Sequence, residues 1–498
     1  MTRTDRAFAY CLQARVSTSL VLAVTGMVLS VTTAPVLHSQ APRQCLLQYE
    51  SPSGNTRTTA LELPSKRYNV FQGGGVTYRC QGQDNTINAD SAEYYGDLSV
   101  LYLVGSVRYN ETRARVNSDR MTYYQLEDRL HAEGNVDVRL ESGTTMRGPN
   151  ADYYRVSPTR ALARTEASGR PRMSLVQRTT VGQPGEPVDV VANRIVAEGD
   201  ELVYASGQVE INRPDLIARG DSAFLDGSRE FARLMMTPSI ESRRDRPFTL
   251  SGGVIDLFSR NRELQRVVAT PKGHALSQDL ELLADSVDLR IDARQLQRVI
   301  AWGKSRARAL SPEREITADS IDAIMPSQRL REVRATGDAY ANSNTDTIRL
   351  ATRERDWIRG DTIVAEFDSI PAADTARRPQ AKRIVSTGNA RSFYQIAGNT
   401  PGIRQPNINY VRGRVITILF ADKAVNVVSV LDQASGLYLE PTIGNVRGAQ
   451  PDGPLPARDV QTPAPGRGTQ TPAPGRGSQT PAPAPTRTPA TPIRRRIQ

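Results

Sequence analysis

Hydrophobic and polar residues alternate along most of this chain, and the clearest alternating stretch begins at Asp319. Ile321 and Ala323 are apolar, whereas Ser320 and Asp322 beside them are polar. A period of two residues is typical of a β-strand with one buried face, not of an amphipathic helix. The same pattern follows further aspartates, which are Asp90, Asp119, Asp152, Asp221, Asp285 and Asp361. The sequence therefore predicts an all-β fold.

A second pattern follows each alternating stretch and consists of an apolar, a small and a glycine residue at every second position. Val333, Ala335 and Gly337 form the clearest copy. Copies of this glycine box recur about every thirty to fifty residues, and they end at Gly105, Gly134, Gly169, Gly207, Pro238, Pro271, Gly303, Gly337 and Gly388. Recurrence near one spacing indicates a repeated structural unit.

Short polar segments separate each aspartate stretch from its glycine box. Examples are YGDLS at 95–99, LDGSR at 225–229 and SRNRE at 259–263, and their Gly, Asp, Asn and Ser residues favour tight turns. Each unit is expected to be an antiparallel hairpin, with a strand that starts at the aspartate and a second strand that ends near the glycine. Hairpins stacked in series can cover one another's apolar faces, which a single hairpin in water cannot do.

The repeated aspartate allows two interpretations. It can accept backbone N–H bonds at the start of a strand, or it can belong to a ladder of metal-binding or catalytic carboxylates. Calcium-binding repeats use much denser Asp and Gly, so the first interpretation is favoured. The glycine is interpreted as a bend or bulge where the strand must curve.

The chain carries little that is typical of an enzyme. Its three histidines are His38, His131 and His274, and the last two have no His or Cys at metal-ligand spacing. Nucleophile-elbow, phosphate-loop and zinc-protease motifs are absent from the sequence. We therefore predict that the protein is not an enzyme and that it has no cofactor and no metal site.

The net charge of +11 resides largely at the two ends of the chain. Residues 1–40 combine arginines with a long uncharged run, as in a secretory signal peptide, and an uncleaved membrane anchor is the alternative. Residues 447–498 repeat Thr-Pro-Ala-Pro and end in arginines, which predicts a disordered tail. The middle lacks clusters of basic and aromatic residues, so no nucleic-acid partner is expected.

Three cysteines are present, and Cys11 lies in the leader. Cys45 and Cys80 form an even pair, which in an exported protein favours a disulfide, with two free thiols as the alternative. Residues 41–87, which contain both, are expected to form a β cap at one end of the hairpin region at 88–446.

The serial hairpins, with Ala-Asp openings and glycine-box closings, resemble the OstA/LptA family of lipopolysaccharide-transport proteins. The segments that carry the resemblance are NADSAEYYGDLSVLYLVGSVRYN at 88–110, the stretch at 117–154, IVAEGDELVYASGQVEI at 195–211 and ITADSIDAIMPSQRLREVRATGDAYA at 316–341. The resemblance implies an elongated antiparallel β-jellyroll, a folded "taco" of strands. Its apolar interior would shield lipopolysaccharide acyl chains, at about 0.8 kcal/mol per buried CH₂.

The resemblance also implies partners and a location. Lipopolysaccharide is the expected ligand, and other jellyroll proteins, or a second copy, are expected to join by edge-strand pairing into a bridge from the inner to the outer membrane. The location implied is the periplasm of a Gram-negative-type bacterium. The alternative is a structural or adhesive β-repeat surface protein without lipid cargo.

The residues expected to line the apolar groove lie on the same side of their strands as the aspartates. They are Met121, Tyr123, Val287, Leu289, Ile291, Ile321, Ile363 and Phe367. A tightly packed core without lipid would show the same alternation, so an open groove and a packed core both remain possible at this point.

Overall fold

The computed structural model describes residues 46–50, 56–176, 187–243, 247–277, 280–345, 350–369, 378–398, 404–421 and 424–441. All of them belong to one compact unit, Met1–Pro441. The predicted leader at 1–40, Cys45 and the predicted tail at 447–498 lie outside the described residues. Within the described part of the chain, no helix is long and apolar enough to cross a membrane.

Thirty strands and one short 3-10 turn, η1 (Pro326–Gln328), form the regular structure of the described residues. The first ten strands are β1 (Leu47–Glu50), β2 (Arg57–Glu62), β3 (Tyr68–Cys80), β4 (Thr86–Tyr95), β5 (Val100–Asn110), β6 (Ala114–Tyr124), β7 (Arg129–Leu140), β8 (Thr145–Tyr154), β9 (Arg164–Ser168) and β10 (Arg172–Leu175). The next ten are β11 (Val188–Val191), β12 (Arg194–Glu198), β13 (Leu202–Asn212), β14 (Leu216–Asp226), β15 (Phe231–Met235), β16 (Ser239–Ser242), β17 (Thr249–Ser251), β18 (Val254–Arg260), β19 (Glu263–Thr270) and β20 (Gly273–Leu276). The last ten are β21 (Glu281–Ala284), β22 (Ser286–Asp292), β23 (Gln295–Leu310), β24 (Arg314–Ile324), β25 (Glu332–Ser343), β26 (Asp356–Phe367), β27 (Ala381–Ala397), β28 (Pro406–Ala421), β29 (Ala424–Leu431) and β30 (Ser435–Leu439).

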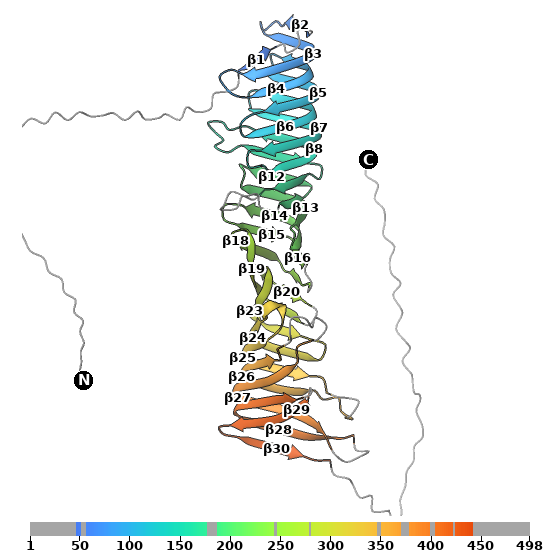
Figure 1. The fold of residues 1–498 in the computed structure, drawn as a ribbon, viewed down its shortest axis with the longest axis vertical. Helices are drawn as coiled ribbons and strands as arrows, with labels where there is room; N and C mark the ends of the chain where they lie inside the picture. Colours follow the sequence, from blue (N-terminus) through green and yellow to red (C-terminus); the bar gives the residue numbers. More distant parts are fainter. Residues whose placement is uncertain are drawn as a thin grey trace, which may run out of the picture. The chain divides into compact units, whose positions relative to one another are not determined.

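The strands pair antiparallel throughout the sheet, which confirms the predicted all-β, antiparallel class. Figure 1 shows them stacked in chain order within this unit, from β2 at one end to β30 at the other. Among the described strands, β1 and β2 pair only with β3, and β29 and β30 pair only with β28. These four strands therefore form the two ends of the sheet.

Most long strands bend near their middle, and β24 with β25 is the clearest case. Thr317 pairs with Tyr340 and Ser320 pairs with Thr336, so two residues of β24 face three of β25 at the bend. We call the line of these bends the corner. Half-sheet 1 comprises the strand segments between the corner and the tight turns predicted from the sequence, and half-sheet 2 comprises the segments on the other side of the corner. The edge opposite the corner, where the outer turns of both half-sheets meet, is called the mouth.

The bend corrects one detail of the hairpin prediction. Asp319 does not start a strand and Gly337 does not end one, because both lie in mid-strand at the corner. Ala318 and Ile321 are both fully buried although they are three positions apart. The alternation thus changes phase at the bend, and a single bent strand looks like two short ones in the sequence.

The tight turns are where the polar segments predicted them. Gly96–Ser99, Gly227–Glu230 and Asn261–Arg262 are turns between paired strands of half-sheet 1. The turns of half-sheet 2 lie several residues beyond each glycine, at the far side of the mouth.

In two stretches the strands end at the corner instead of bending through it. The longer stretch closes into a ring of pairings, in the order β14, β16, β17, β20, β21, β23, β22, β19, β18 and β15. Pro238, Gly253 and Pro271 lie between the strands that end there. Proline has no N–H to donate to a ladder, so a strand stops readily at these positions.

One apolar core fills the space between the half-sheets from β3 to β28. Residues of both half-sheets meet across it, as the rings of Tyr109 and Tyr153 do at 6.1 Å between centroids. The core thus lies between the corner and the mouth, and the outward faces of both half-sheets carry the polar residues.

Candidate functional site between the half-sheets

Five of the seven repeated aspartates pack against glycines at the corner. A Cβ atom on Gly337, whose φ is +87°, would lie 2.2 Å from Oδ2 of Asp319. The other aspartate pairs are Gly105 with Asp90, Gly134 with Asp119, Gly303 with Asp285 and Gly388 with Asp361, and Asn193 takes the place of the aspartate at Gly207. Asp285 Oδ2 also accepts the backbone N–H of Ser305 at 2.8 Å, and this bond lowers the pKa of Asp285. These contacts agree with a structural role for the carboxylates. Among the described residues, no three His, Cys, Asp or Glu side chains gather closely enough to hold a metal ion.

The eight residues predicted to line a groove lie in or against the core. Six of them are at most 1% exposed, and these are Met121, Tyr123, Val287, Leu289, Ile321 and Ile363. Ile291 and Phe367 are partly buried and pack against the same core. None of the eight lines the cavity described next.

A cavity of about 280 Å³ opens at the mouth, in the part of the unit formed by β10 to β18. Its apolar lining comes from both half-sheets and includes Leu175, Val188, Ile211, Leu225, Phe231 and Leu257. The volume lies near the lower end of the usual range for small-molecule sites, about 300–1,000 Å³. An apolar guest of modest size can therefore be removed from water between the two half-sheets.

Charged side chains from the outer turns surround this cavity. Arg213 Nε pairs with Asp215 Oδ1 at 3.1 Å, and Arg213 Nη2 donates to the carbonyl oxygen of Arg262 at 3.5 Å. This second bond runs from half-sheet 2 to a turn of half-sheet 1, so it bridges the mouth. Asp226 accepts hydrogen bonds from the hydroxyl of Ser228 at 2.6 Å and from the N–H of Arg229 at 3.1 Å. These bonds lower the pKa of Asp226, whose carboxylate is thus already well satisfied.

Among the described residues that line the cavity, Arg262 carries a buried nitrogen without a hydrogen-bond partner. It forms the two-residue turn between β18 and β19 with Asn261, and both residues have positive φ, 67° and 51°. Its Nη1 atom is buried without a hydrogen-bond partner in the described part of the chain. Burial lowers the pKa of Arg262, and the nearby Glu230 acts in the opposite direction. The sequence analysis placed Arg262 only in a turn and did not identify it as a site residue. The available signal was an arginine at a turn position where Gly or Asn is usually favoured.

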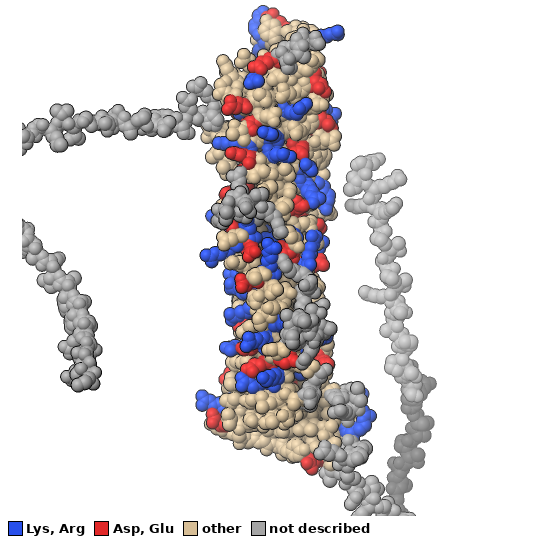
Figure 2. All heavy atoms as spheres, viewed as in Figure 1, with Lys and Arg blue, Asp and Glu red and all other residues tan. Residues whose placement is uncertain are grey.

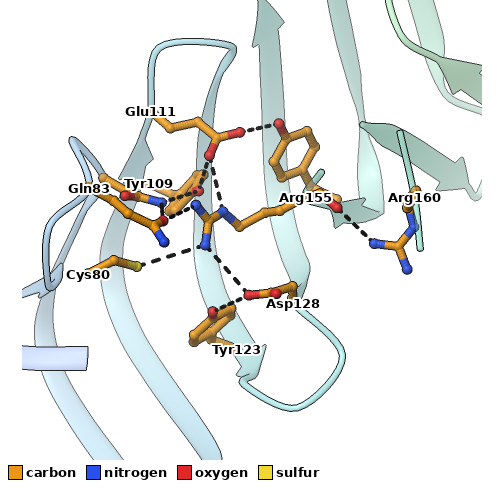
Figure 3. A network of polar contacts seen from close by, with 10 residues as sticks. Cys80, Gln83, Tyr109, Glu111, Tyr123, Asp128, Arg155 and Arg160 are labelled. Carbon is orange, nitrogen blue, oxygen red and sulfur yellow. Dashed lines mark hydrogen bonds and ion pairs between the residues drawn. The ribbon is translucent and has the colours of Figure 1, made fainter. Parts of the chain in front are cut away.

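A buried polar network closes the mouth on the N-terminal side of the cavity (Figure 3). Arg155, which follows β8 in half-sheet 1, pairs through Nε with Glu111 Oε2 at 3.1 Å and through Nη1 with Asp128 Oδ1 at 3.6 Å. Its Nη2 donates to Gln83 Oε1 at 2.6 Å. Glu111 and Gln83 belong to turns of half-sheet 2, whereas Asp128 belongs to half-sheet 1. One guanidinium thus ties the two half-sheets together.

Three tyrosine hydroxyls complete the Arg155 network. Tyr109 donates to Glu111 Oε2 at 2.7 Å, Tyr123 donates to Asp128 Oδ1 at 3.0 Å, and Tyr153 donates to Glu111 Oε1. Burial, and then the nearby carboxylates, raise the pKa of all three hydroxyls, which therefore remain protonated donors. The carboxylates of Glu111 and Asp128 are thus paired with the cation and with hydroxyl donors, as buried charges require. Asn85 Nδ2 donates to Gln83 Oε1 at 3.3 Å and to the Tyr109 hydroxyl at 3.4 Å, while its Oδ1 is buried without a hydrogen-bond partner.

Cys80, one of the two cysteines of the predicted disulfide, lies at the edge of the same network. Cys80 is disulfide-bonded, and its Sγ is 3.9 Å from Nη1 of Arg155. Cys45, the predicted partner, lies outside the described residues.

The mouth is also bridged on the C-terminal side of the cavity. The guanidinium of Arg314, in half-sheet 2, lies 5.6 Å from the ring centroid of Phe420 in half-sheet 1, and burial lowers the pKa of Arg314. Close by, burial raises the pKa of Asp356 to about 6, although the backbone N–H of Gln395 donates to its Oδ1 at 2.9 Å. The cavity thus lies in a segment of the mouth between two bridged segments.

The geometry at the mouth singles out this cavity as the candidate ligand site. It combines an apolar lining from both half-sheets, a turn arginine without a hydrogen-bond partner and bridged segments on either side. No protein-family model matches this chain, and no curated protein matches it in sequence.

Proposed function

We propose that this protein is a periplasmic lipopolysaccharide-binding and transport protein, which shields acyl chains between its half-sheets and helps to bridge the inner and outer membranes. The proposal includes the finer architecture, an elongated β-jellyroll built from serial hairpin units of two bent strands each. The recurring Asp–Gly contacts at the corner support that architecture, because an Asp–Gly pair makes the same bend at five places and an Asn–Gly pair makes it at a sixth.

The cavity at the mouth is the observation that carries this proposal. An alkyl chain that enters it leaves water at a gain of about 0.8 kcal/mol per CH₂, and no covalent step is required. Leu225 and Leu257 from half-sheet 1 and Ile211 from half-sheet 2 supply the apolar contacts. A lipid carrier needs such a site to be reachable from outside, and the mouth provides the opening.

The ends of the sheet support the proposed partners. β2 and β30 are exposed along their whole length, and Leu61, Leu437 and Leu439 are each about half exposed. Few charged residues appear on the visible face near β28 and β30, in contrast to the mixed charges along the rest of the unit (Figure 2). A free strand edge with apolar side chains can add a strand from another sheet, so a second jellyroll, or a second copy, fits these ends.

Site-specific photo-crosslinking in a Gram-negative periplasm tests the proposed function. The full chain carries a photoreactive residue at Leu257, which lines the cavity, or at Tyr102, which is 39% exposed on the outer face. We expect lipopolysaccharide adducts from Leu257 and none from Tyr102. Absence of lipopolysaccharide from Leu257 and from other cavity positions would contradict the proposal.

Tight packing at the predicted lining residues favours a second candidate function. Val287 and Ile321 are fully buried, so at these positions the interior is filled by protein. A structural or adhesive surface protein without lipid cargo needs only such a core. Binding of the full chain to glycans or to whole cells, with no lipid recovered from the purified protein, would favour this candidate.

A further inference from the structure

We infer that the cavity at the mouth binds one alkyl chain of an amphiphile whose anionic group, a carboxylate or a phosphate, pairs with Arg262. This inference deepens the proposed function and rests on it, because it assigns a ligand class to the same cavity. It follows from three properties of the cavity, namely the Arg262 Nη1 atom without an acceptor, the cavity volume and the hydrogen bonds and ion pairs of the other charged residues.

The guanidinium of Arg262 supplies the polar contact. Nη1 is buried at the cavity and donates to no acceptor among the described residues. A buried donor without a partner is uncommon in folded proteins, and an acceptor on a ligand would satisfy it. Arginine binds carboxylate and phosphate oxygens through short, charge-assisted hydrogen bonds, so an anionic group is the natural acceptor.

The volume limits the apolar part of the ligand. About 280 Å³ is near the lower end for small-molecule sites and fits one chain, not a bundle of several acyl chains. Leu175 and Val188 lie on one side of this space and Leu257 lies on the other. A chain between them would be enclosed by both half-sheets, with its head at the turn that carries Arg262.

The charged residues that line the cavity are two arginines, Arg213 and Arg262, and four acidic residues, Asp200, Glu201, Asp226 and Glu230. Of the two arginines, Arg262 is the one with a buried donor that has no acceptor among the described residues. Arg213 is neutralised by Asp215 at 3.1 Å, and the carboxylate of Asp226 accepts hydrogen bonds from its own turn. The charge of Glu230 raises the pKa of Arg262, but the two side chains form no ion pair among the described residues. A bound anion would therefore meet one cation, Arg262, whose Nη1 has no acceptor among the described residues.

The test measures how the full chain binds four probes with the same dodecyl chain and different heads, below their micelle concentrations. The heads are a carboxylate, a phosphate, a trimethylammonium group and maltose. We expect the carboxylate and phosphate probes to bind about tenfold more tightly than the other two, which corresponds to about 1.4 kcal/mol. A difference between the first two tells a fatty-acid-like from a phospholipid-like ligand. Equal affinities, or a preference for the cationic probe, would overturn the inference.

Two variants locate the effect. Arg262→Gln should remove the preference for anionic heads, whereas Arg260→Gln, at an exposed position two residues away, should preserve it. Ala232→Phe, which adds a ring inside the cavity, should weaken all four probes. Circular dichroism confirms that each variant is folded. If the folded Arg262→Gln variant keeps the full preference for the anionic probes, the inference is wrong.

The outcomes for this inference and for the proposed function are separable. If anionic probes bind through Arg262 but a photoreactive residue at Leu257 yields no lipopolysaccharide adduct, the inferred ligand class is supported and the proposed lipopolysaccharide transport is contradicted. If Leu257 yields lipopolysaccharide adducts equally with Arg262 and with Gln at that position, and the probes show no head preference, the transport function stands and the inference falls.

Discussion

The contact between Asp319 and Gly337 predicts that Gly337→Ala weakens the sheet locally. The added Cβ would lie 2.2 Å from Oδ2, 2.6 Å from Cγ and 2.7 Å from Cβ of Asp319. These distances are well below the roughly 3.5–4.0 Å at which carbon atoms attract each other. In addition, the backbone of Gly337 has a φ of +87°, where a side chain is strained.

Two terms give the expected magnitude. The left-handed backbone costs an alanine about 1–2 kcal/mol, and overpacking of this kind costs about 1–3 kcal/mol. Gly337→Ala should therefore lower the local stability by about 2–5 kcal/mol. In an Asp319→Gly background all three short contacts disappear, so the same substitution should cost only about 1–2 kcal/mol.

Hydrogen exchange at the amides of β24 and β25 is the suitable measurement. In a serial array each unit contacts mainly its neighbours, so local opening reports the change more directly than global unfolding does. Gly73→Ala in β3 is the matched control, because a Cβ there meets nothing within 4 Å. We expect the control to change local stability by less than about 0.5 kcal/mol. An equal cost of Gly337→Ala with and without Asp319, or a cost no larger than that of Gly73→Ala, would refute the reasoning.

Three further predictions concern the mouth and the ends of the sheet. Arg155→Met leaves Glu111 and Asp128 buried without their cation, so it should lower the free energy of unfolding, measured by thermal unfolding, by about 3–5 kcal/mol. Arg147 belongs to a surface ion pair and its side chain is 68% exposed, so Arg147→Met should lower the free energy of unfolding by only about 0–1 kcal/mol. Because burial raises the pKa of Asp356 from 3.8 to about 6, the folded state holds this proton more tightly, and its contribution to stability is lost as the pH rises from about 4 to 6. Asp356→Asn should therefore stabilise the protein by about 1–2 kcal/mol at pH 7, after allowance for solvent screening, and much less at pH 4; equal gains at both pH values would contradict this. Leu439→Pro removes a backbone donor from β30 and should lower the oligomer size seen in analytical ultracentrifugation, whereas unchanged assembly would show that this edge is not used.

The sequence was informative where structure is local. The alternation, the polar turns and the glycine boxes predicted the strand class and the tight turns, because each depends on a few neighbouring residues. The sequence wrongly placed Asp319 at the start of a strand and Gly337 at the end of one. The bend makes both Ala318 and Ile321 buried although they are three positions apart, and in the sequence this shift in the alternation looks like the boundary between two strands.

The site was beyond sequence reasoning for a physical reason. The cavity joins Leu175 and Val188 to Leu257, residues that become neighbours only when the two half-sheets face each other. Arg155 stands between Tyr154 and Val156 with no acidic neighbour in sequence, and its partner Glu111 is 44 positions away. A pattern of single residues cannot show which outer turns will meet across the mouth.

The strands that end at Pro238 and Pro271 have a mechanical consequence. Where a strand bends through the corner, opening the mouth must distort a continuous backbone ladder on both sides of the bend. Between β14 and β23 the half-sheets are joined at the corner by short connections instead of shared strands. This stretch should therefore open more easily than the parts whose strands bend through the corner, and it begins beside the cavity, whose walls include β14, β15 and β18. Widening can be confined there while the bent strands toward either end keep their spacing.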